Sequence, residues 1–552
     1  MPITHNSLAS LQDSVDSLIR GGDLETPLEM IQAFVERIVS DPLATGRVFS
    51  APALDELCLR LGAQVLSQSN VVTPAPSEGR IVYVATEFYR VGGHTLVAAD
   101  IVRNLPDREH VFLLTDVLTN PHRDAPDLRL VPLGAKVEIA PTGPRLEKLK
   151  WLLARLFELA PGKIYWFNHH QDVVAIAAAQ PAIPGDKYFI HHGDHNLCLG
   201  VHTPHLHHVD LANLGYFNCR DVLGIANNQY WPLVCDDLGQ RDRGRRFIQA
   251  GRLRTCSSGG ENKFEVPYLY NYADVLARVL SATGGDHVHV GLLSEEHLER
   301  IRRQLAEADI PQERFVHVSW VPSLWRALIE RGVDVYLMSW PIGGGRALIE
   351  AMGAGIPSVI HMNYISRYHG GFDVGYADAL TWRTSTELAD LLGAFTPESL
   401  AVQSLSVRAH YEKHHTPEIL ASLLRGDAGT GPAPIPLRDY HPDRLQIFLD
   451  ERAQHDAQFA NLNQTVAEKD GQIVSLNQTV AERDGQIVSL NQTVAERDGQ
   501  IAYLTQVVAE RERQTTLLAI SRDAILDSTS WQITKPLRLV VHQIKKILKL
   551  GI

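Results

Sequence analysis

The chain has 552 residues, of which 45% are hydrophobic and 21% are charged, so its composition is that of a globular protein too long for one hydrophobic core. The net charge of −12 argues against a general nucleic-acid binder, and five scattered cysteines without a Cys-x-x-Cys pair argue against a disulfide framework or a zinc ribbon. The N-terminus lacks a basic start followed by an apolar core, and no run of about 18 apolar residues occurs, so we expect neither a signal peptide nor a membrane-spanning helix.

The first region, residues 1–75, is expected to form a helical cap. Apolar side chains recur there every three or four residues, which is the period of an amphipathic helix. They form two sets, Leu11, Val15, Leu18 and Ile19, then Ile31, Phe34, Val35 and Ile38. Pro74 and Pro76 mark the linker that follows.

Residues 78–240 predict a first α/β domain. Short apolar runs typical of buried strands alternate there with helical stretches, which indicates a parallel sheet with crossover helices. The expected strands are 81–85, 111–114, 163–167 and 187–191. A loop with Gly92, Gly93 and His94 follows the first strand, and a helix is expected over 95–103.

Residues 241–425 predict a second domain of the same kind. The expected strands are 246–250, 288–291, 315–318, 335–338 and 357–360. Parallel strands need long crossover connections, and helical stretches of suitable length separate these runs. Two such sets in succession predict an α/β protein with two Rossmann-like domains that face each other across a cleft.

After a linker at 426–450, residues 451–526 predict a coiled coil. A 14-residue unit, or two heptads, begins at Asn463, Asn477 and Asn491. Valine or isoleucine occupies the a positions, and leucine alternates with lysine or arginine at the d positions. This pattern predicts a homo-oligomer, because β-branched a residues favour a parallel dimer while the charged layers leave a trimer open.

The last segment, residues 530–552, predicts a basic amphipathic helix. One helical face carries Leu537, Val540, Val541, Ile544, Ile547 and Leu548. The surrounding positions carry Lys535, Arg538, Lys545, Lys546 and Lys549. Such a helix is typical of an element that lies on a membrane surface, and a helix docked on another domain is the alternative.

A glycine-rich turn joins an apolar strand to a helix at Gly343, Gly344 and Gly345. Glycines at a helix start let backbone N–H groups approach an anion, and the helix dipole favours negative charge there. Glu350 lies about two turns into the same helix, where its carboxylate can accept hydrogen bonds from a sugar or ribose hydroxyl. The stretch therefore predicts a site for a diphosphate attached to a sugar.

The two α/β domains, the Gly-Gly-His loop and the stretch Gly343–Pro357 resemble a GT-B glycosyltransferase of the family 4, or group 1, type found in bacterial surface-polysaccharide (O-antigen) clusters. The resemblance implies that Glu350 binds the nucleotide ribose and that Arg252 and Lys263 hold the donor diphosphate. The first glutamate of the family's Glu-x7-Glu signature would fall at Ile342. Its absence leaves open the contact with the donor sugar and the stereochemical outcome.

A histidine-rich segment after the expected strand 187–191 supplies candidate catalytic residues. Transfer to a hydroxyl needs a base for the acceptor or assistance from the leaving group, and the candidates are Asp194 and His195, with His94 as a third. A metal site is the alternative, because histidines cluster at His191, His192, His195, His202, His205, His207 and His208. No His-Glu-x-x-His or Asp-x-Asp motif occurs and no cysteine pairs with these histidines, so we expect no metal and no cofactor.

These features predict an enzyme, a hexosyl- or deoxyhexosyltransferase that moves a sugar from a nucleotide-sugar donor to a lipid-linked glycan such as O-antigen. We expect it in the cytoplasm, peripheral on the inner face of the cell membrane, because surface anchoring brings an enzyme to a lipid-linked acceptor. Two alternatives stay open. One is a nucleotide-sugar epimerase, and the other is a non-catalytic GT-B-like scaffold or chain-length component assembled by the coiled coil.

Overall fold

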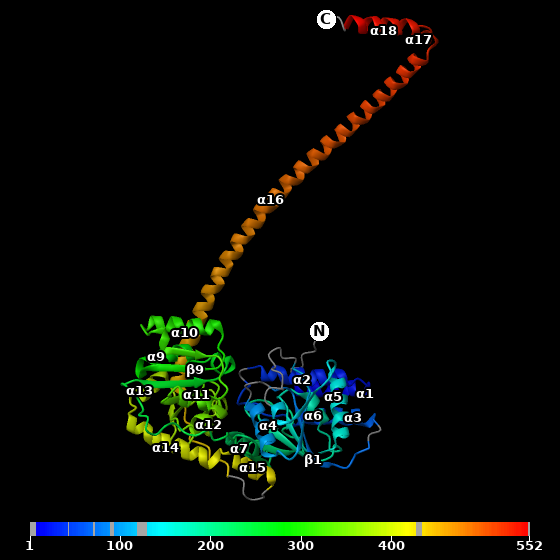
Figure 1. Cartoon of the computed structure of the whole chain (residues 1–552). Helices are drawn as coiled ribbons and strands as arrows, with labels where there is room; N and C mark the ends of the chain where they lie inside the picture. Colours follow the sequence, from blue (N-terminus) through cyan, green and yellow to red (C-terminus); the bar gives the residue numbers. More distant parts are fainter. Residues whose placement is uncertain are drawn as a thin grey trace. The chain divides into compact units, whose positions relative to one another are not determined.

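The computed structural model describes residues 7–41, 44–69, 72–88, 93–118, 130–426 and 433–549. The chain divides into two compact units, residues 1–451 and residues 452–552. The first unit holds both β-sheets, and the second is helical over almost all of its described residues (Figure 1).

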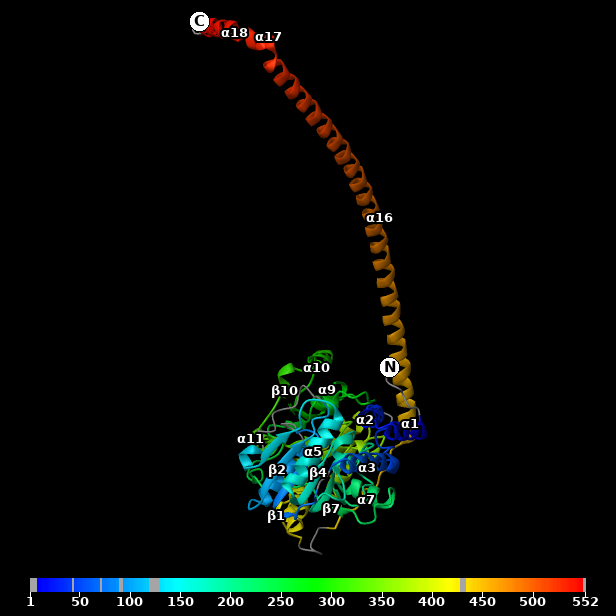
Figure 2. The same ribbon diagram turned by 90° about the vertical axis from the view of Figure 1, so that its right-hand side faces the viewer.

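Three N-terminal helices form a layer on the first α/β domain. The helices of this layer and of the layer beneath it are α1 (Leu8–Arg20), α2 (Glu25–Val39), α3 (Pro52–Ser67), α5 (Arg145–Leu159) and α6 (Val173–Ala178). Ser7 caps α1 by accepting a hydrogen bond from the Ser10 amide, and Pro52 starts α3, where a missing N–H costs nothing. Figure 2 shows α1, α2 and α3 beside the strands of the first sheet. Buried apolar residues of all five helices belong to one hydrophobic core, so the region 1–75 is part of the first domain's packing.

The first sheet has seven parallel strands in the order β3-β2-β1-β4-β5-β6-β7. They are β1 (Ser77–Ala85), β2 (Glu109–Leu114), β3 (Lys136–Ile139), β4 (Pro161–Phe167), β5 (Asp186–His191), β6 (His207–Asp210) and β7 (Gln229–Tyr230). Two further helices of this domain are α4 (Gly93–Asn104) and α7 (Asn213–Asp221). Strand β1 is buried on both faces, because Val82 and Val84 enter one core while Tyr83 and Ala85 enter the other.

The second sheet has six parallel strands in the order β10-β9-β8-β11-β12-β13. They are β8 (Leu253–Ser258), β9 (Gly284–Val290), β10 (Phe315–Val318), β11 (Val335–Leu337), β12 (Ser358–His361) and β13 (Leu380–Trp382). The helices are α8 (Glu261–Phe264), α9 (Tyr272–Thr283), α10 (Glu295–Glu307), α11 (Leu324–Glu330), α12 (Gly345–Gly353), α13 (Ser385–Gly393), α14 (Pro397–His414) and α15 (Pro417–Arg425).

The predicted α/β class with two Rossmann-like domains is confirmed, and one predicted strand is wrong. Residues 246–250 form a turn in which Ile248 and Ala250 have φ values of 54° and 53°. The first strand of the second sheet is β8, which begins only at Leu253. The short strands β3, β6, β7 and β13 were not predicted.

Both sheets reverse their strand order beside their first strand. The chain moves outward from β1 to β3 and then returns to β4 on the other side of β1, and it repeats this path from β8 through β10 to β11. In open parallel sheets the loops that leave the two central strands diverge at this point and leave room for a ligand at the carboxyl edge. The loops after β1, β4, β8 and β11 are therefore where a site is expected.

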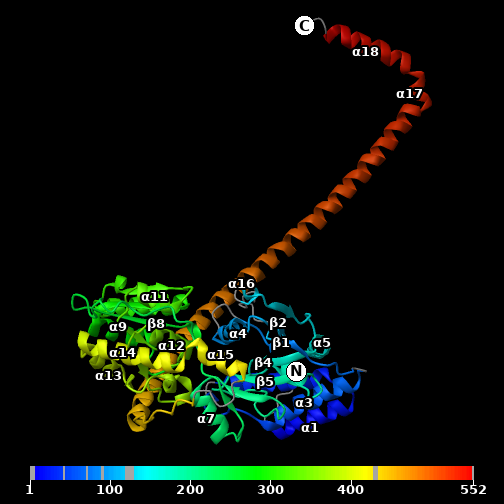
Figure 3. The same ribbon diagram turned by 60° about the horizontal axis from the view of Figure 1, so that its bottom comes forward.

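The end of the second domain returns to the first. Helix α14 packs on α12, and α15 packs on α4 of the first domain (Figure 3). Leu420 and Leu424 of α15 share a hydrophobic core with Val97 and Ile101 of α4. The two domains are thus joined by a buried apolar contact as well as by the chain connection.

The long helix α16 (Arg444–Asp527) begins at the end of the first unit, and from residue 452 onward it forms the second unit together with α17 (Thr529–Ile533) and α18 (Lys535–Lys549). Helix α16 begins within the predicted linker 426–450 and covers every 14-residue repeat. Its predicted core positions are exposed in the single chain, with Val466 at 51% and Leu476 at 64%. Within the described residues, no helix combines the length and apolarity that crossing a membrane requires.

Candidate functional site

A lysine and the glycine turn meet at the carboxyl edge of the second sheet. Lys263 lies on α8 after β8, and Gly343 lies in the turn after β11, so they follow the two strands where the strand order reverses. The Lys263 ammonium donates to the Gly343 carbonyl at 2.8 Å, and the Ile342 amide approaches the Lys263 carbonyl at 3.4 Å. The sheet topology therefore brings together two predicted site residues that are distant in sequence.

The Lys263 ammonium is a half-buried cation. Burial lowers its pKa to about 8, and no charged neighbour opposes that shift. Among the residues that the structure describes, no carboxylate pairs with it, and its hydrogen-bond partner is a neutral carbonyl. Because burying a charge without a counter-ion is costly, this position suits a lysine whose counter-ion is a bound ligand.

The start of helix α12 lies beside this lysine. The helix begins at Gly345, and no side chain in the described part of the chain caps it. The first N–H groups of a helix have no partner inside the helix, and the helix dipole attracts an anion to them. The ammonium and the helix start together form a site for a phosphate group.

The three glycines of the turn differ in how much space a side chain would have at each position. A Cβ atom on Gly343 would lie 1.8 Å from the Gly370 carbonyl oxygen, so two backbone segments touch there. A Cβ atom on Gly344 would lie 3.2 Å from the Lys263 ammonium and would narrow the space beside it. Gly345 has ordinary contacts at 3.7 Å, so neighbouring atoms do not require a glycine at that position.

Glu350 lies on α12 and is half-buried. Its Oε2 atom accepts a hydrogen bond from the Trp325 amide at 3.0 Å, which satisfies an N–H group in the first turn of α11. One carboxylate oxygen therefore stabilises the start of the neighbouring helix α11. The predicted contact between Glu350 and a ribose stays a prediction.

Arg252 does not lie at this edge of the sheet, and the prediction that it holds the donor diphosphate stays a prediction. It precedes β8 by one residue, is exposed, and its amide donates to the Gln249 carbonyl in a turn. Strand β8 spans about 17 Å from its first to its last residue, and Lys263 follows its other end. The strand expected at 246–250 does not form, which is why Arg252 precedes the first strand of the second sheet instead of following it.

Three histidines gather at the carboxyl edge of the first sheet. His94 lies in the first turn of α4, His169 lies two residues after the end of β4, and His192 directly follows β5. Their ring centroids lie 5.1–5.6 Å apart. Burial lowers the pKa of His94 to about 4 and that of His169 to about 3, so these rings are neutral near pH 7. Gly92 of the predicted loop lies outside the described residues.

The predicted pair Asp194–His195 borders the second domain. Asp194 Oδ1 lies 3.7 Å from His195 Nδ1, and both side chains are partly exposed. His195 lies close enough to His369 of the second domain to oppose its protonation, and burial and His195 together lower the pKa of His369 to about 4. The His369 carbonyl accepts a hydrogen bond from the Gly343 amide at 2.7 Å. The two predicted halves of the site therefore meet at the domain interface.

Sequence reasoning missed a residue next to the glycines. Arg346, in the first turn of α12, donates to Asp100 of α4 at 2.5 Å, where the Asp100 side chain is buried and that of Arg346 is 12% exposed. Burial raises the pKa of Asp100, and Arg346 opposes the rise. Removing one partner of a buried ion pair costs about 3–5 kcal/mol, so this pair fixes the start of α12 against the first domain. Its one sequence signal was an arginine directly after the glycines.

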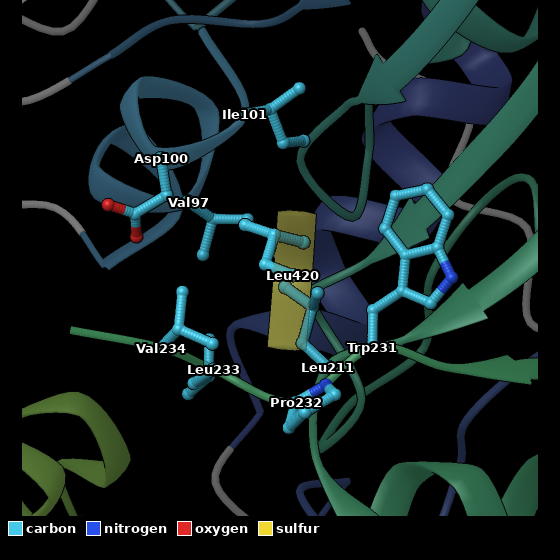
Figure 4. A pocket seen from close by; sticks show the side chains of 9 residues that line it. All are labelled: Val97, Asp100, Ile101, Leu211, Trp231, Pro232, Leu233, Val234 and Leu420. Atoms are coloured by element: carbon cyan, nitrogen blue, oxygen red, sulfur yellow. The ribbon is translucent and has the colours of Figure 1, made fainter. Parts of the chain in front are cut away.

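An apolar cavity lies beside Asp100 (Figure 4). Its walls come from four places in the chain, namely Val97, Asp100 and Ile101 of α4, Leu211, the segment Trp231–Val234, and Leu420 of α15. The described residues that line it include one carboxylate and no cation, so the cavity does not suit a diphosphate. The candidate anion site is the turn beside Lys263.

No family model matches the sequence, and no curated protein matches it. A glycosyltransferase from Rickettsia africae has a similar structure, with a TM-score of 0.50 at 10% identity over 64% of this chain and 97% of that chain. HepE from Anabaena, solved with UDP-glucose, gives 0.49 at 14% identity over 63% of this chain and 98% of that chain. WaaG, a glycosyltransferase involved in lipopolysaccharide biosynthesis, gives 0.43 at 11% identity over 63% of this chain and 100% of that chain. At these identities the likeness concerns the fold alone. The chain has the GT-B fold, as the resemblance of its sequence predicted.

Proposed function

We propose that this GT-B chain transfers a sugar from a nucleotide-sugar donor to an acceptor hydroxyl. The observation that carries the proposal is the Lys263 ammonium, a half-buried cation that no described carboxylate pairs with, at the start of α12. A diphosphate supplies the missing negative charge, and a nucleotide sugar carries that diphosphate beside the bond to be broken.

In the proposed reaction, the bond between the anomeric carbon and the donor phosphate breaks, and the nucleoside diphosphate leaves with additional negative charge. Lys263 and the N–H groups of Gly344 and Gly345 stabilise that charge as it develops. Glu350 binds the ribose in this proposal. Because the chain itself supplies the positive charge, we expect the transfer to need no metal ion and no cofactor.

On the acceptor side, we assign the base to Asp194 and His195. The attacking hydroxyl must lose its proton as it bonds to the anomeric carbon, and a partly exposed imidazole beside a carboxylate can take it. The Nε2 atom of His94 donates to the Glu87 carbonyl at 3.1 Å, so the neutral ring carries its proton there. We therefore assign His94 to positioning the acceptor.

The proposal is tested by measuring the thermal shift of the purified chain with UDP-, GDP- and dTDP-sugars, with Lys263→Ala as the matched variant. One donor class should raise the melting temperature of the wild type by several degrees and leave the variant unchanged. Sugar release that depends on acceptor glycan supports a transferase, while an epimerised donor without acceptor supports the epimerase. A chain that binds none of these donors would be a scaffold, and the proposal would be rejected.

We further propose that the acceptor is a lipid-linked surface glycan such as O-antigen and that α18 holds the enzyme on the inner face of the cell membrane. Apolar residues of α18 are exposed, including Leu537 at 72% and Ile547 at 69%, and basic side chains accompany them. Deleting residues 530–552 should release the chain from anionic vesicles in a flotation assay. Equal flotation of both chains would contradict the anchor.

The coiled coil is proposed to join two or three copies of this chain. The exposed valine, isoleucine and leucine rows of α16 have no partner in one chain, and a second copy covers them in register. Light scattering should give a dimer or trimer for the full chain and a monomer for the double variant Leu476→Asp, Leu490→Asp. A monomeric wild type would refute the assembly.

A further inference from the structure

Four potential metal ligands converge behind the loop that carries Asp194. His191 ends β5, His208 and Asp210 lie on β6, and Cys219 lies on α7. In the parallel register His191 faces Asp210, and His208 lies two residues before Asp210, so all three side chains point to the same face of the sheet. Cys219 is buried above that face.

The four ligand atoms lie within 4.8 Å of one another. His191 Nδ1 is 3.0 Å from Asp210 Oδ1, and His208 Nε2 is 3.1 Å from the same oxygen. Cys219 Sγ is 3.4 Å from His191 Nδ1. Ligands of a tetrahedral zinc ion lie about 3.3–3.6 Å apart, given zinc bonds of about 2.0–2.3 Å, so the cluster needs only small adjustments to hold one.

Three potential donors converge on the Asp210 carboxylate. His191 Nδ1 and His208 Nε2 both lie against Asp210 Oδ1, and the Cys219 thiol is a further hydrogen-bond partner of this carboxylate. A cation among the four side chains can take the place of these hydrogen bonds, because a neutral imidazole, a thiolate and a carboxylate each offer it a lone pair.

We propose that His191, His208, Asp210 and Cys219 bind a structural Zn²⁺ ion. One thiolate, one carboxylate and two neutral imidazoles balance the charge of a divalent cation, so the buried site is electrically neutral. Mixed sulfur, nitrogen and oxygen ligands suit zinc, and a closed set of four protein ligands is typical of a structural site. The ion is independent of the proposed transfer chemistry.

A second layer of contacts supports the ligand geometry. Asn228 Nδ2 donates to Asp210 Oδ2 at 2.6 Å and also to the Tyr216 carbonyl at 2.9 Å. Outer hydrogen bonds of this kind hold a ligating carboxylate in place. The ion links β5, β6 and α7, and the loop with Asp194 leaves directly from His191, so we expect it to stiffen that loop.

The test is the metal content of the full chain, purified under reducing conditions without chelator. Mass spectrometry should find about one zinc per chain, and Cys219→Ser should retain at least tenfold less. The matched control is Cys198→Ser, which changes another buried cysteine outside the cluster and should keep the metal. If the Cys198 variant lost as much zinc as the Cys219 variant, Cys219 could not be assigned as a zinc ligand.

Cobalt replacement provides a second readout that does not depend on how a variant folds. The zinc-free wild type should take up one Co²⁺ and show the near-ultraviolet charge-transfer band of a cobalt thiolate. Asp210→Asn, which preserves the side-chain volume, should bind Co²⁺ at least tenfold more weakly. A wild-type chain that holds less than a tenth of a zinc and takes up no Co²⁺ would overturn the proposal and leave a hydrogen-bonded cluster.

Discussion

The two sheets reverse their strand order at the same point, but the side chains at their carboxyl edges differ in charge. At the second sheet, Lys263 and the start of α12 present positive charge. At the first sheet, His94 and His169 present neutral imidazoles, because burial lowers the pKa of both rings. The comparison teaches that strand order fixes where a ligand can bind, while the side chains that follow the strands decide whether that ligand is an anion or a neutral hydroxyl.

The largest expected effect comes from removing the cation of the second edge. Lys263→Ala should lower kcat/KM for the nucleotide sugar by about 10²–10³-fold, because a fixed positive group no longer stabilises the leaving diphosphate. The measurement is sugar release from the donor class found by thermal shift. Arg252→Ala, at the opposite end of β8, should stay within twofold of wild type. Equal losses in both variants would show that the cations act nonspecifically.

The substitution His195→Ala tests the proposed base at the carboxyl edge of the first sheet. Loss of the proposed base should reduce kcat by about 10²-fold and leave the donor-induced thermal shift unchanged, since the donor binds at the other edge. His207→Ala is the control, because His207 is an exposed histidine on the neighbouring strand β6. A parallel loss of donor binding in the His195 variant would mean that the two edges are not separate sites.

The glycine turn separates close packing from helix geometry. Gly343→Ala should lower the free energy of unfolding by about 1–3 kcal/mol, because the new Cβ meets the Gly370 carbonyl and the backbone must move. Gly345→Ala meets only ordinary contacts and should change it by less than about 0.5 kcal/mol. Urea denaturation of both variants measures the difference. Equal stability would show that the turn relaxes without cost.

The smallest expected effect is a pH dependence of donor binding at the carboxyl edge of the second sheet. The pKa of Lys263 is lowered to about 8, so its protonated fraction falls about tenfold between pH 7 and pH 9, and the affinity for a nucleoside diphosphate should fall with it. Calorimetric titration at the two pH values measures this change. Lys263→Arg should abolish the dependence, because arginine stays protonated.

The free energy of unfolding should change with pH in the opposite direction from the affinity for the diphosphate. Above about pH 8 the unfolded chain keeps the Lys263 proton that the folded chain loses. Lys263 should therefore make the ligand-free chain more stable as pH rises from about 8 toward the unfolded pKa near 10.4. If the affinity of the wild type for a nucleoside diphosphate stayed constant between pH 7 and pH 9, Lys263 would not be the group that binds the diphosphate.

Most of the fold was predictable because buried strands of a parallel sheet are continuous apolar runs. Strand β8 shows where this signal ends, since its sequence is Leu-Arg-Thr-Cys-Ser-Ser. Thr255 of this strand is fully buried and shares a hydrogen bond of 2.8 Å with His287 Nδ1 on β9. A polar strand that is satisfied by its neighbour has no apolar run, and the wrong strand prediction at 246–250 followed from it.

The sequence by itself determined the features that lie within one segment. These are the glycine turn at Gly343–Gly345, the heptads of α16 and the amphipathic face of α18, because each depends on spacing along a single element. The tertiary structure alone decided the pair Arg346–Asp100, the neutral cluster around His94 and the four proposed zinc ligands. Those groups come from strands and helices far apart in sequence, and only sheet order and register place them within bonding distance.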